Sequence, residues 1–499
     1  MTQLRTIWVF GDQLNRNIGV LRDADPSTDS ILMIESFLKT TSRPWHKQRL
    51  HFIVSSMRHF AEDLRAEGFL VDYRMASHMS EGLSGHVAQF GPSHVIATEP
   101  NSVGARALLT RLNVEQVPSN QFLTSHGEFA AWASTRKSLK MEDFYRRQRV
   151  RLGYLMDNGE PAGGQWNFDH DNREAPPKSG AYPWATPPTT AMDTIDRDVA
   201  TSLPASSVGQ PPTGTWATSR SEALKRLSHF IDHLLPQFGP HEDAMLSDNW
   251  HLAHSMLSPY LNNGLLLASE VCDAVQVAFD SGRVPIASAE GFIRQVIGWR
   301  EYVWGLYWLW MPDYASMNEL SAHRPLPPVF TDPTQTKMSC MSGCVGDVHD
   351  RAWAHHIPRL MVMGNLALIA GVNPQAMTNW MWEMFIDSAE WVMVPNVIGM
   401  SLHADGGRMA TKPYAGGGAY IDRMSNYCKG CHYDRKKRVG DDACPFTTLY
   451  WDFLLRHADR FVRNPRIATQ VRAAQKLSDT EAVQRRAAEV LAMLDSGRL

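Results

Sequence analysis

The chain has 499 residues, of which 43% are hydrophobic and 20% are charged, and its formal net charge is −3. A charge so near zero excludes a protein that coats nucleic acid by overall basicity, so contact with DNA would need a local basic patch. Six cysteines in so long a chain exclude a disulfide framework, and no apolar run is long enough to span a membrane, so we expect a cytoplasmic protein.

Residues 1–150 are expected to form an α/β domain with a doubly wound, mostly parallel sheet. Short apolar runs of strand length lie at 6–10, 30–35, 69–74 and 94–98. Ligands of such sheets bind beyond the carboxyl ends of the strands, and two of these ends carry Asp12 and Glu35. Both carboxylates are therefore candidate ligand contacts, although helix caps would use the same residues. No GxGxxG motif follows the first strand, so an ordinary dinucleotide site is not expected.

Residues 151–218 are interpreted as a long interdomain linker, because Gly and Pro interrupt them repeatedly. The segment 164–173 is aromatic and charged, so we expect the linker to lie ordered on the surface of the domains. Residues 219–499 are expected to form an all-α domain. Its predicted helices include 222–235, 289–310, 355–370 and 374–391. A capping-box pattern at 478–481 predicts the start of a final helix.

Cysteine spacing toward the C-terminus predicts a metal centre. Cys428 and Cys431 form a CxxC pair, and Cys444 stands directly before a proline. Thiolates at this spacing bind zinc or an iron–sulfur cluster, and either Cys340 or Cys344 could supply the fourth ligand. The Cys-Pro ending is more typical of cluster sites. A zinc staple and unligated thiols are the alternatives.

Two segments offer polar side chains at expected helix starts. Ser255 and Ser258 flank a turn whose hydroxyls and amides could accept phosphate or could simply cap the helix. His356 and Arg359 are three residues apart and share one helical face, and histidine is suited to proton transfer near neutral pH. Asp387 is a plausible carboxylate partner for Arg359, and this pair could bracket a polar cofactor ring. A lone histidine pair is nevertheless more often structural than catalytic.

The helix expected at 289–310 spaces four side chains around its axis: Arg294, Gln295, Trp299 and Glu301. We expect them to reach one cavity that could hold an unstacked base or a flavin ring, whereas a buried salt-bridge seam would use the same residue types. The glycine-rich segment 412–421 would present Tyr414 and Tyr420 at a rim. The basic run 435–438 is either a solvated face or a contact to the phosphate backbone.

In order and spacing, these residues resemble the photolyase/cryptochrome superfamily. The matching motifs are Leu257-Ser-Pro-Tyr-Leu, Trp299-Arg-Glu, His355-His356-x-x-Arg359 and Asp387. The four-cysteine set, the segment 164–173 and the segment 412–420 narrow the resemblance. It is then to the iron–sulfur bacterial cryptochromes and photolyases, the prokaryotic (6-4) photolyase branch, from about residue 5 to about residue 465.

The resemblance implies three cofactors. FAD in a bent conformation would lie in the helical domain against Ser255, Leu257, Ser258, Leu261, Gln295, Arg300, Arg359, Asp387 and Met393. A [4Fe-4S] cluster would be held by Cys340, Cys428, Cys431 and Cys444. Cys340 is preferred to Cys344 because the first ligand of the family aligns with it. A 6,7-dimethyl-8-ribityllumazine antenna would contact Asp12 and Glu35.

The activity implied by the resemblance is light-driven repair of (6-4) photoproducts in UV-damaged DNA, carried out by a monomer. Photoexcited reduced FAD would donate an electron to the lesion, and His356 as imidazolium would supply the proton that a (6-4) product needs. His355 lies beside this histidine. Tyr414 and Tyr420 match tyrosines near the lesion, and Trp380 matches a tryptophan on the electron route to the flavin.

Two positions depart from the family pattern. Met393 stands where a polar or acidic side chain near flavin N5 is usual, and Met381 follows Trp380 where an aromatic residue would extend the electron route. Both leave open how the flavin is photoreduced, and Trp382 or Trp391 could substitute. The alternative functions are a blue-light cryptochrome with little repair and a zinc-stabilised DNA-binding protein without flavin.

Overall fold

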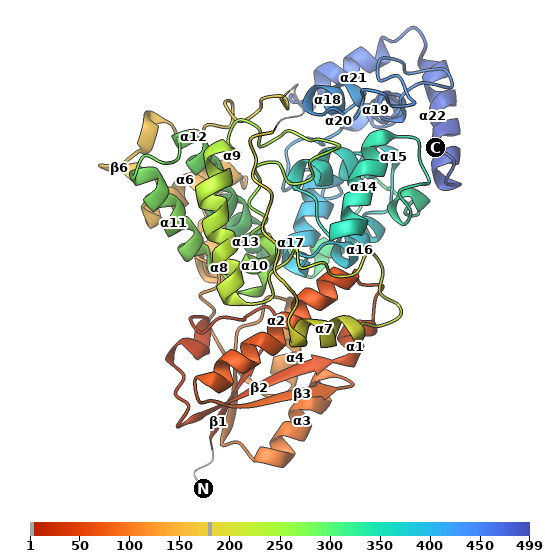
Figure 1. Cartoon of the computed structure of the whole chain (residues 1–499). Helices are drawn as coiled ribbons and strands as arrows, with labels where there is room; N and C mark the ends of the chain where they lie inside the picture. The colour runs from red at the N-terminus through yellow and green to blue at the C-terminus, as the bar shows by residue number, and fades with distance from the viewer. Residues whose placement is uncertain (1–3, 178–181) are drawn as a thin grey trace.

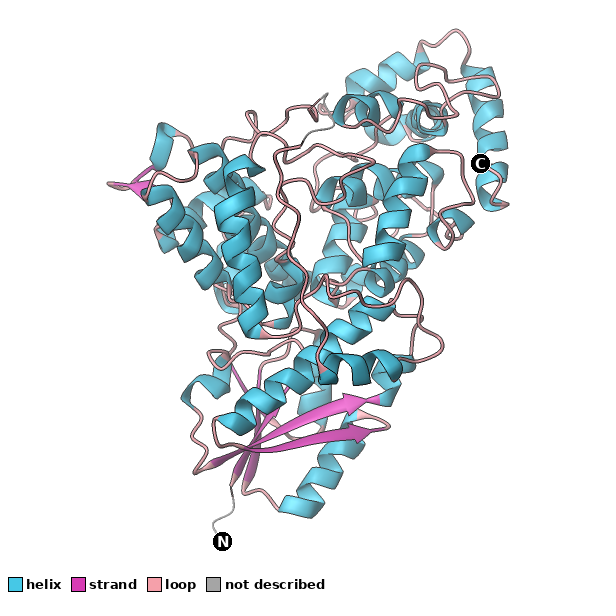
Figure 2. Cartoon of the chain, viewed as in Figure 1, coloured by secondary structure: helices cyan, strands magenta, loops and turns pink. Residues whose placement is uncertain are grey.

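The computed structural model of the chain describes residues 4–177 and 182–499 (Figure 1). Residues 178–181 of the expected linker lie outside the described residues, as do the first three. A sheet with its helices occupies the N-terminal end of the molecule, and nearly all other regular structure is helical (Figure 2). Within the described ranges, no helix is long and apolar enough to cross a membrane.

The N-terminal region contains a five-stranded, fully parallel sheet in the order β3-β2-β1-β4-β5. Its strands are β1 (Arg5–Val9), β2 (Asp29–Ser36), β3 (Leu70–Ala76), β4 (His94–Thr98) and β5 (Glu115–Val117). Its connecting helices are α1 (Phe37–Thr41), α2 (Lys47–Ala66), α3 (Met79–Phe90) and α4 (Val103–Arg111). Nearly all of β2 is buried, because helices cover both faces of the sheet. The predicted parallel α/β region is confirmed.

Two helices that follow the sheet pack against the helical region instead. They are α5 (His126–Ser134), inside the segment 1–150, and α6 (Met141–Leu152), which extends two residues past it. The ring of Phe129 on α5 meets the ring of Tyr302 edge-on at 6.0 Å. The hydroxyl of Tyr145 on α6 donates to Glu290 at 2.6 Å. These two helices therefore pack with the helical region, although they follow β5 directly in the sequence.

The segment between the two regions is ordered where it is described. It contains β6 (Met156–Asp157), β7 (Glu160–Pro161), the short 3₁₀ turn η2 (Ala162–Gly164) and α7 (Thr194–Thr201). Phe168, Trp184 and Trp216 are buried in it. The indole of Trp216 donates to the backbone oxygen of Arg351 at 3.0 Å. Aromatic anchors thus hold this proline-rich stretch on the molecule, where it runs between two groups of helices (Figure 1).

The rest of the chain is helical, as predicted. The helices up to the middle of this region are α8 (Arg220–His229), α9 (Leu235–Phe238), α10 (Ser258–Asn263), α11 (Ala268–Asp280), α12 (Ile286–Ile293) and α13 (Glu301–Trp310). Those that follow are α14 (Ser339–Arg351), α15 (Asn365–Ala370), α16 (Pro374–Met384), α17 (Glu390–Val394), α18 (Gly418–Met424), α19 (Pro445–Arg456), α20 (Ala458–Phe461), α21 (Ala468–Gln475) and α22 (Thr480–Asp495). π-helical turns join several of them at η3 (Phe230–Leu234), η4 (Arg294–Arg300), η7 (Pro358–Gly364) and η8 (Pro395–Ser401).

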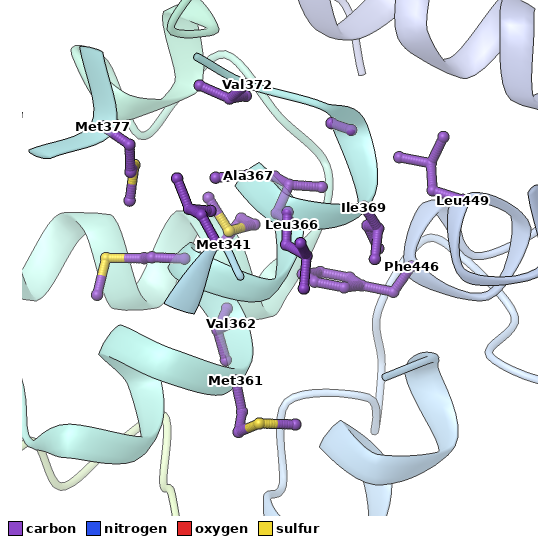
Figure 3. Close-up of a cluster of buried hydrophobic side chains, with 14 of the residues drawn as sticks. Met341, Met361, Val362, Leu366, Ala367, Ile369, Val372, Met377, Phe446 and Leu449 are labelled. Atoms are coloured by element: carbon purple, nitrogen blue, oxygen red, sulfur yellow. The ribbon is translucent and has the colours of Figure 1, made fainter. Parts of the chain in front are cut away.

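The largest core of the helical region lies among α14, the η7–α15 helix and α19. Figure 3 shows Met341, Leu366, Phe446 and Leu449 gathered in this cluster, and all four are fully buried. Several methionines fill the gaps between the branched side chains, a use that suits their flexible thioether. This core fixes the η7–α15 helix, which carries Arg359 at one end.

Two predicted features differ in the structure. The single helix expected at 374–391 is wrong, because α16 ends at Met384 and α17 begins at Glu390. The break is held by backbone and side-chain bonds, including Ile386 N–H to the oxygen of Ala352 at 2.8 Å. The capping box at 478–481 is also wrong. Asp479 stands at the helix start without a capping bond, because its carboxylate instead accepts from Arg438 at 2.8 Å.

Candidate functional site

A buried carboxylate forms the centre of the candidate site. Asp387 lies in the break between α16 and α17, and Arg359 on η7 donates to its two oxygens at 3.0 and 2.9 Å. The hydroxyl of Ser258, the first residue of α10, donates to the same carboxylate at 2.7 Å. Asn262 donates to the backbone oxygen of Asp387 at 2.8 Å. Two other segments, η7 and α10, therefore converge on one residue, and the bonds to its carboxylate are charge-assisted.

Other expected flavin contacts lie on α10 and in the turn before it. Leu257 and Leu261 are buried, and the hydroxyl of Ser255 accepts from the backbone N–H of Leu257 at 3.3 Å. The guanidinium of Arg300 donates to the backbone oxygen of Leu261 at 3.2 Å. Its Nε is buried without a partner among the described residues. Burial costs such a donor free energy unless an acceptor meets it, so this side chain fits a site with a polar ligand.

Three histidines cluster where η7 begins. His355 is 4% exposed, and neither of its ring nitrogens has a partner in the described part of the chain. Its ring stacks on that of His254 at 4.1 Å, and burial lowers the pKa of both imidazoles well below the usual range. His356 is exposed, and its Nε2 lies 3.3 Å from Asp243. The buried pair is therefore uncharged at neutral pH, and only His356 faces the surface beside a carboxylate.

The two tyrosines of the glycine-rich segment lie in the same neighbourhood. Asn365 anchors this segment, because its side-chain amide donates to the oxygen of Gly416 at 2.8 Å and its Oδ1 accepts from the N–H of that glycine at 3.0 Å. Burial raises the pKa of Tyr414 and of Tyr420, and the charge of Asp243 acts on both phenols. Asp243 thus connects these tyrosines with His356.

Of the four side chains expected to share a cavity around residues 294–301, Arg294 and Gln295 both reach Glu242, whereas Trp299 and Glu301 have other partners. Gln295 donates to Glu242 at 2.7 Å, and Arg294 pairs with Glu290 at 3.3 Å. On another side of the helix, Glu301 accepts from the backbone N–H of Thr124 at 2.8 Å. Trp299 packs near Tyr302 in an aromatic core. Neighbouring helical residues point in different directions, so Arg294 belongs to a buried ion-pair seam, the alternative that the sequence left open.

Trp380, the residue predicted to lie on the electron route, has aromatic ring contacts only with phenylalanines among the described residues. Trp380 is buried, its indole donates to the backbone oxygen of Phe330 at 2.9 Å, and its ring meets Phe330 and Phe385. Met393 and Met381 are both buried and apolar. The structure therefore provides no polar side chain at either departing position.

The cysteines expected to bind a metal gather in a second place. Cys340 on α14, Cys428, Cys431 and Cys444 line one small cavity. Burial and the neighbouring thiols raise the pKa of Cys340 well above its usual value. Cys344 does not line this cavity, and its Sγ lies 3.7 Å from the hydroxyl of Tyr427. The choice of Cys340 over Cys344 agrees with this arrangement.

The spacing of the sulfur atoms distinguishes between a single ion and a cluster. A tetrahedral zinc ion holds sulfur about 2.3 Å away, so its ligand sulfurs stand about 3.8 Å apart. Among the described residues, no three cysteine sulfurs lie within 4.8 Å of one another. At Gly418 an added Cβ would lie only 3.0 Å from Cys444 Sγ, so the backbone approaches the centre closely. The donor set therefore fits a group larger than one ion.

The basic run beside the cysteines is largely neutralised. Arg435 pairs with Asp422 at 2.5 Å, and Lys437 pairs with Asp442 at 2.5 Å. Arg438 is occupied by Asp479, as described above. These three ion pairs leave Lys436 as the side chain of the run without an ion pair among the described residues, so they reduce the attraction of the run for a phosphate backbone.

The two carboxylates at the sheet edge are held by different partners. Asp12 accepts from the amide of Asn101, which follows β4, at 3.0 Å, and burial raises the pKa of its carboxyl. Glu35 accepts from Arg58 on α2 and from the hydroxyl of Tyr73 on β3, both at 3.0 Å. Asp12 therefore bonds toward β4 and Glu35 toward β3, which lie in opposite directions across the strand order.

Sequence reasoning missed three residues of the site. Asn262 follows the recognised motif directly, so an extended reading of that motif could have found it. His254 and Asp243 carry no local signal, because their role depends on the η7 histidines more than 100 positions away in the chain. Only the folded chain brings these segments together.

Comparison with known proteins reveals clear relatives. The chain is 42% identical over 494 residues to a (6-4) photolyase of Agrobacterium fabrum, and the match covers 96% of each chain. Residues 7–213 match the family described as deoxyribodipyrimidine photo-lyase-related protein. An uncharacterized protein of Acanthamoeba polyphaga mimivirus is 34% identical over 101 residues, covering 20% of this chain and 75% of that protein. The crystal structure of a bacterial class III photolyase from Agrobacterium tumefaciens aligns with a TM-score of 0.57 at 15% identity, covering 99% and 98% of the two chains.

Proposed function

Because this chain belongs to the family of the Agrobacterium (6-4) photolyase, we propose that it is a light-dependent DNA repair enzyme that reverses (6-4) photoproducts. The observation that carries the proposal is 42% identity over 96% of both chains. The convergence of Arg359 and Ser258 on Asp387 agrees with it, since the resemblance assigns these residues to one cofactor. UV-damaged DNA is then the partner, and the cytoplasm the expected compartment.

The family implies a flavin, and the residues around Asp387 fit one. Arg359 and Asp387 offer a fixed pair of donor and acceptor, Leu257 and Leu261 offer apolar walls, and the unpartnered Nε of Arg300 needs an acceptor. When bound and excited by light in its reduced form, flavin adenine dinucleotide would supply the electron for repair. The protein would hold its rings between α10, η7 and the break after α16.

His356 is the proposed proton donor. The chemistry of a (6-4) product needs a proton as well as an electron, because a group must return from one base to the other. His356 is the exposed member of its cluster, and its Nε2 lies 3.3 Å from the carboxylate of Asp243. His355 is buried and uncharged, so it would position the neighbouring residues rather than donate. Tyr414 and Tyr420 would border the lesion.

We propose that the cysteine centre holds a [4Fe-4S] cluster. The four cysteines Cys340, Cys428, Cys431 and Cys444 line one cavity, and no three of their sulfurs lie within 4.8 Å of one another, which suits a cluster better than one zinc ion. The cluster would join α14 to the segment before α19 and so stabilise the helical region. We also propose a lumazine antenna at the sheet edge. There Asp12 would contact it, and Glu35 would act through Arg58 and Tyr73.

The deciding experiment is illuminated repair of two defined oligonucleotides, one with a (6-4) product and one with a cyclobutane dimer. We expect blue light to restore the (6-4) substrate and to leave the cyclobutane dimer unchanged. Protein that retains flavin yet repairs neither substrate would favour the signalling alternative. A colourless preparation that contains zinc and no iron would support the third alternative.

The role of His356 can be separated from folding. We predict that His356→Ala keeps its flavin spectrum and loses (6-4) repair by at least about a hundredfold, as expected when a proton donor is removed. His233→Ala is the matched control, because His233 is exposed and has no side-chain hydrogen bond to a described residue. Equal repair rates for the His356→Ala protein and the control would exclude His356 as the donor.

A further inference from the structure

The helical region contains a further cavity that shares no residue with either site described above. Its volume is about 270 Å³, near the lower end for small-molecule pockets. Four parts of the chain form it: the loop at 320–325, the C-terminal end of α15 with the turn into α16, Leu402 after η8, and the C-terminal end of α19. It is therefore a meeting point of segments that no motif in the sequence connects.

Two arginines line this cavity, and each has a nitrogen to spare. Arg324 donates Nε to the oxygen of Ala370 at 3.2 Å and Nη1 to Asp495. Arg456 donates Nη2 to the oxygen of Ile369 and Nε to Asp452, both at 2.6 Å. The bonds to the oxygens of Ala370 and Ile369 cap the C-terminal end of α15. The other bond of each guanidinium goes to an aspartate carboxylate.

The unused guanidinium atoms are Nη2 of Arg324 and Nη1 of Arg456, which have no hydrogen-bond partner among the described residues. Gly371 lines the cavity, and a Cβ built on it would lie 3.9 Å from Nη1 of Arg456. This distance places the free nitrogen at the cavity wall. Two guanidinium groups with free donors at one cavity are suited to phosphate.

The remaining lining strengthens the preference for an anion. His323 and His457 line the cavity, and no acidic residue is among its described lining residues. Burial, with Arg456 and Arg460 nearby, lowers the pKa of His457 to about 4, so its ring is neutral at pH 7 in surroundings that disfavour a cation. Leu320, Leu368 and Leu402 supply an apolar wall that could pack against a carbon skeleton.

The loop at 320–325 is held in place without any ligand. The side chain of Asn318 donates to the oxygen of Ala322 and accepts from its N–H, both at 2.9 Å. The backbone N–H of Arg324 donates to the oxygen of Gly371 at 3.1 Å. The cavity is therefore preformed, so a ligand would not need to order this loop.

From these features we propose that the cavity binds a small organic phosphate, with its phosphoryl group between Arg324 and Arg456 and its carbon skeleton against the leucines. The η7–α15 helix connects the cavity with the site around Asp387, because Arg359 precedes Ala370 by eleven residues, or about 17 Å of helix. An occupant would add contacts at the far end of the helix that carries Arg359.

The test is calorimetric titration of the flavin-loaded full chain with glycerol 3-phosphate, with glycerol and inorganic phosphate as comparison probes. We expect saturable binding of glycerol 3-phosphate, weaker binding of inorganic phosphate and none of glycerol. Arg456→Lys and Ala322→Phe should each weaken binding at least about tenfold, the first by removing Nη1 and the second by filling the cavity. Arg485→Lys, an exposed change elsewhere in this region, should bind as the wild type does.

The proposal is overturned if glycerol 3-phosphate does not bind saturably, or if both cavity variants bind it as the wild type does. Lesion-free duplex DNA that displaces glycerol 3-phosphate from the wild type would also overturn it, because the phosphate would then be that of nucleic acid. If Arg456→Lys does not fold, as judged by circular dichroism, Ala322→Phe decides alone. Its side chain changes while the backbone bonds to Asn318 stay available.

Discussion

The candidate carboxylates of the helical region and of the sheet region differ in whether other predicted site residues supply their hydrogen-bond partners. Asp387 bonds to Arg359 on η7 and to Ser258 and Asn262 on α10, so two other segments of the helical region meet at this residue. At the sheet edge, Asp12 follows β1 and Glu35 lies near the end of the neighbouring strand β2, and yet the two carboxylates bond to different partners. Proximity along a sheet edge therefore does not by itself build a site, whereas the break between α16 and α17 brings together side chains from two other segments.

The largest expected effect concerns the cysteines of the helical region. Cys428→Ala should lower bound iron from about four atoms per chain to near zero and make much of the protein insoluble, because a cluster contributes to folding. Cys344→Ala is the matched control and should keep its iron, since that thiol faces Tyr427. Elemental analysis of the purified proteins measures both. Normal iron in soluble Cys428→Ala protein would contradict the ligand set.

Asp387→Asn tests the bonds that Arg359 and Ser258 make to the carboxylate of Asp387. The change leaves the partly buried Arg359 without its charged partner, so we expect the free energy of unfolding to fall by about 3 to 5 kcal/mol and flavin to be lost on desalting. Glu35→Gln is the matched change in the sheet region. It should cost about 1 to 2 kcal/mol and leave flavin bound. Urea unfolding and flavin absorbance measure the two outcomes, and equal losses in the two regions would remove the contrast.

Glu242→Gln tests a pH dependence that belongs to the helical region. Burial raises the pKa of Glu242 to about 7, whereas its value in the unfolded chain is about 4.5. The folded protein therefore keeps a proton that the unfolded chain loses, and this contribution to stability, complete below about pH 4.5, disappears as the pH rises to about 7.

Replacing this carboxyl with an amide should remove the dependence. The stability of Glu242→Gln relative to the wild type should then rise by about 2 to 3 kcal/mol between pH 5 and pH 8. Urea unfolding at both values provides the measurement. Parallel pH profiles for the two proteins would show that Glu242 does not titrate in this range.

The smallest expected effect on stability is in the sheet region. Asp12→Asn should change the free energy of unfolding by less than about 1 kcal/mol, because the amide can keep a bond with Asn101. If the antenna contacts Asp12, the variant should lose lumazine fluorescence and retain its flavin. Unchanged lumazine content would move the antenna away from this residue.

Sequence reasoning succeeded for features that local chemistry dictates. The apolar runs predicted four of the five strands, and the helical remainder followed from periodicity. It failed where a tertiary contact overrode a local sequence pattern. The apolar stretch 374–391 has helical spacing throughout, yet tertiary bonds to Ala352 interrupt it at Phe385. The 478–481 pattern has the form of a capping box, yet Asp479 is used by Arg438.

What the sequence determined by itself is the set of chemical groups: four spaced thiols, a helical Arg359 with a carboxylate downstream, and a histidine pair. Tertiary structure decided which of them meet. It buried His355 and left His356 exposed, it turned Cys344 toward Tyr427, and it separated Asp12 from Glu35. The physical reason is that residue type sets what a side chain can do, whereas burial and long-range packing set its partners, and those contacts join residues as far as 89 positions apart.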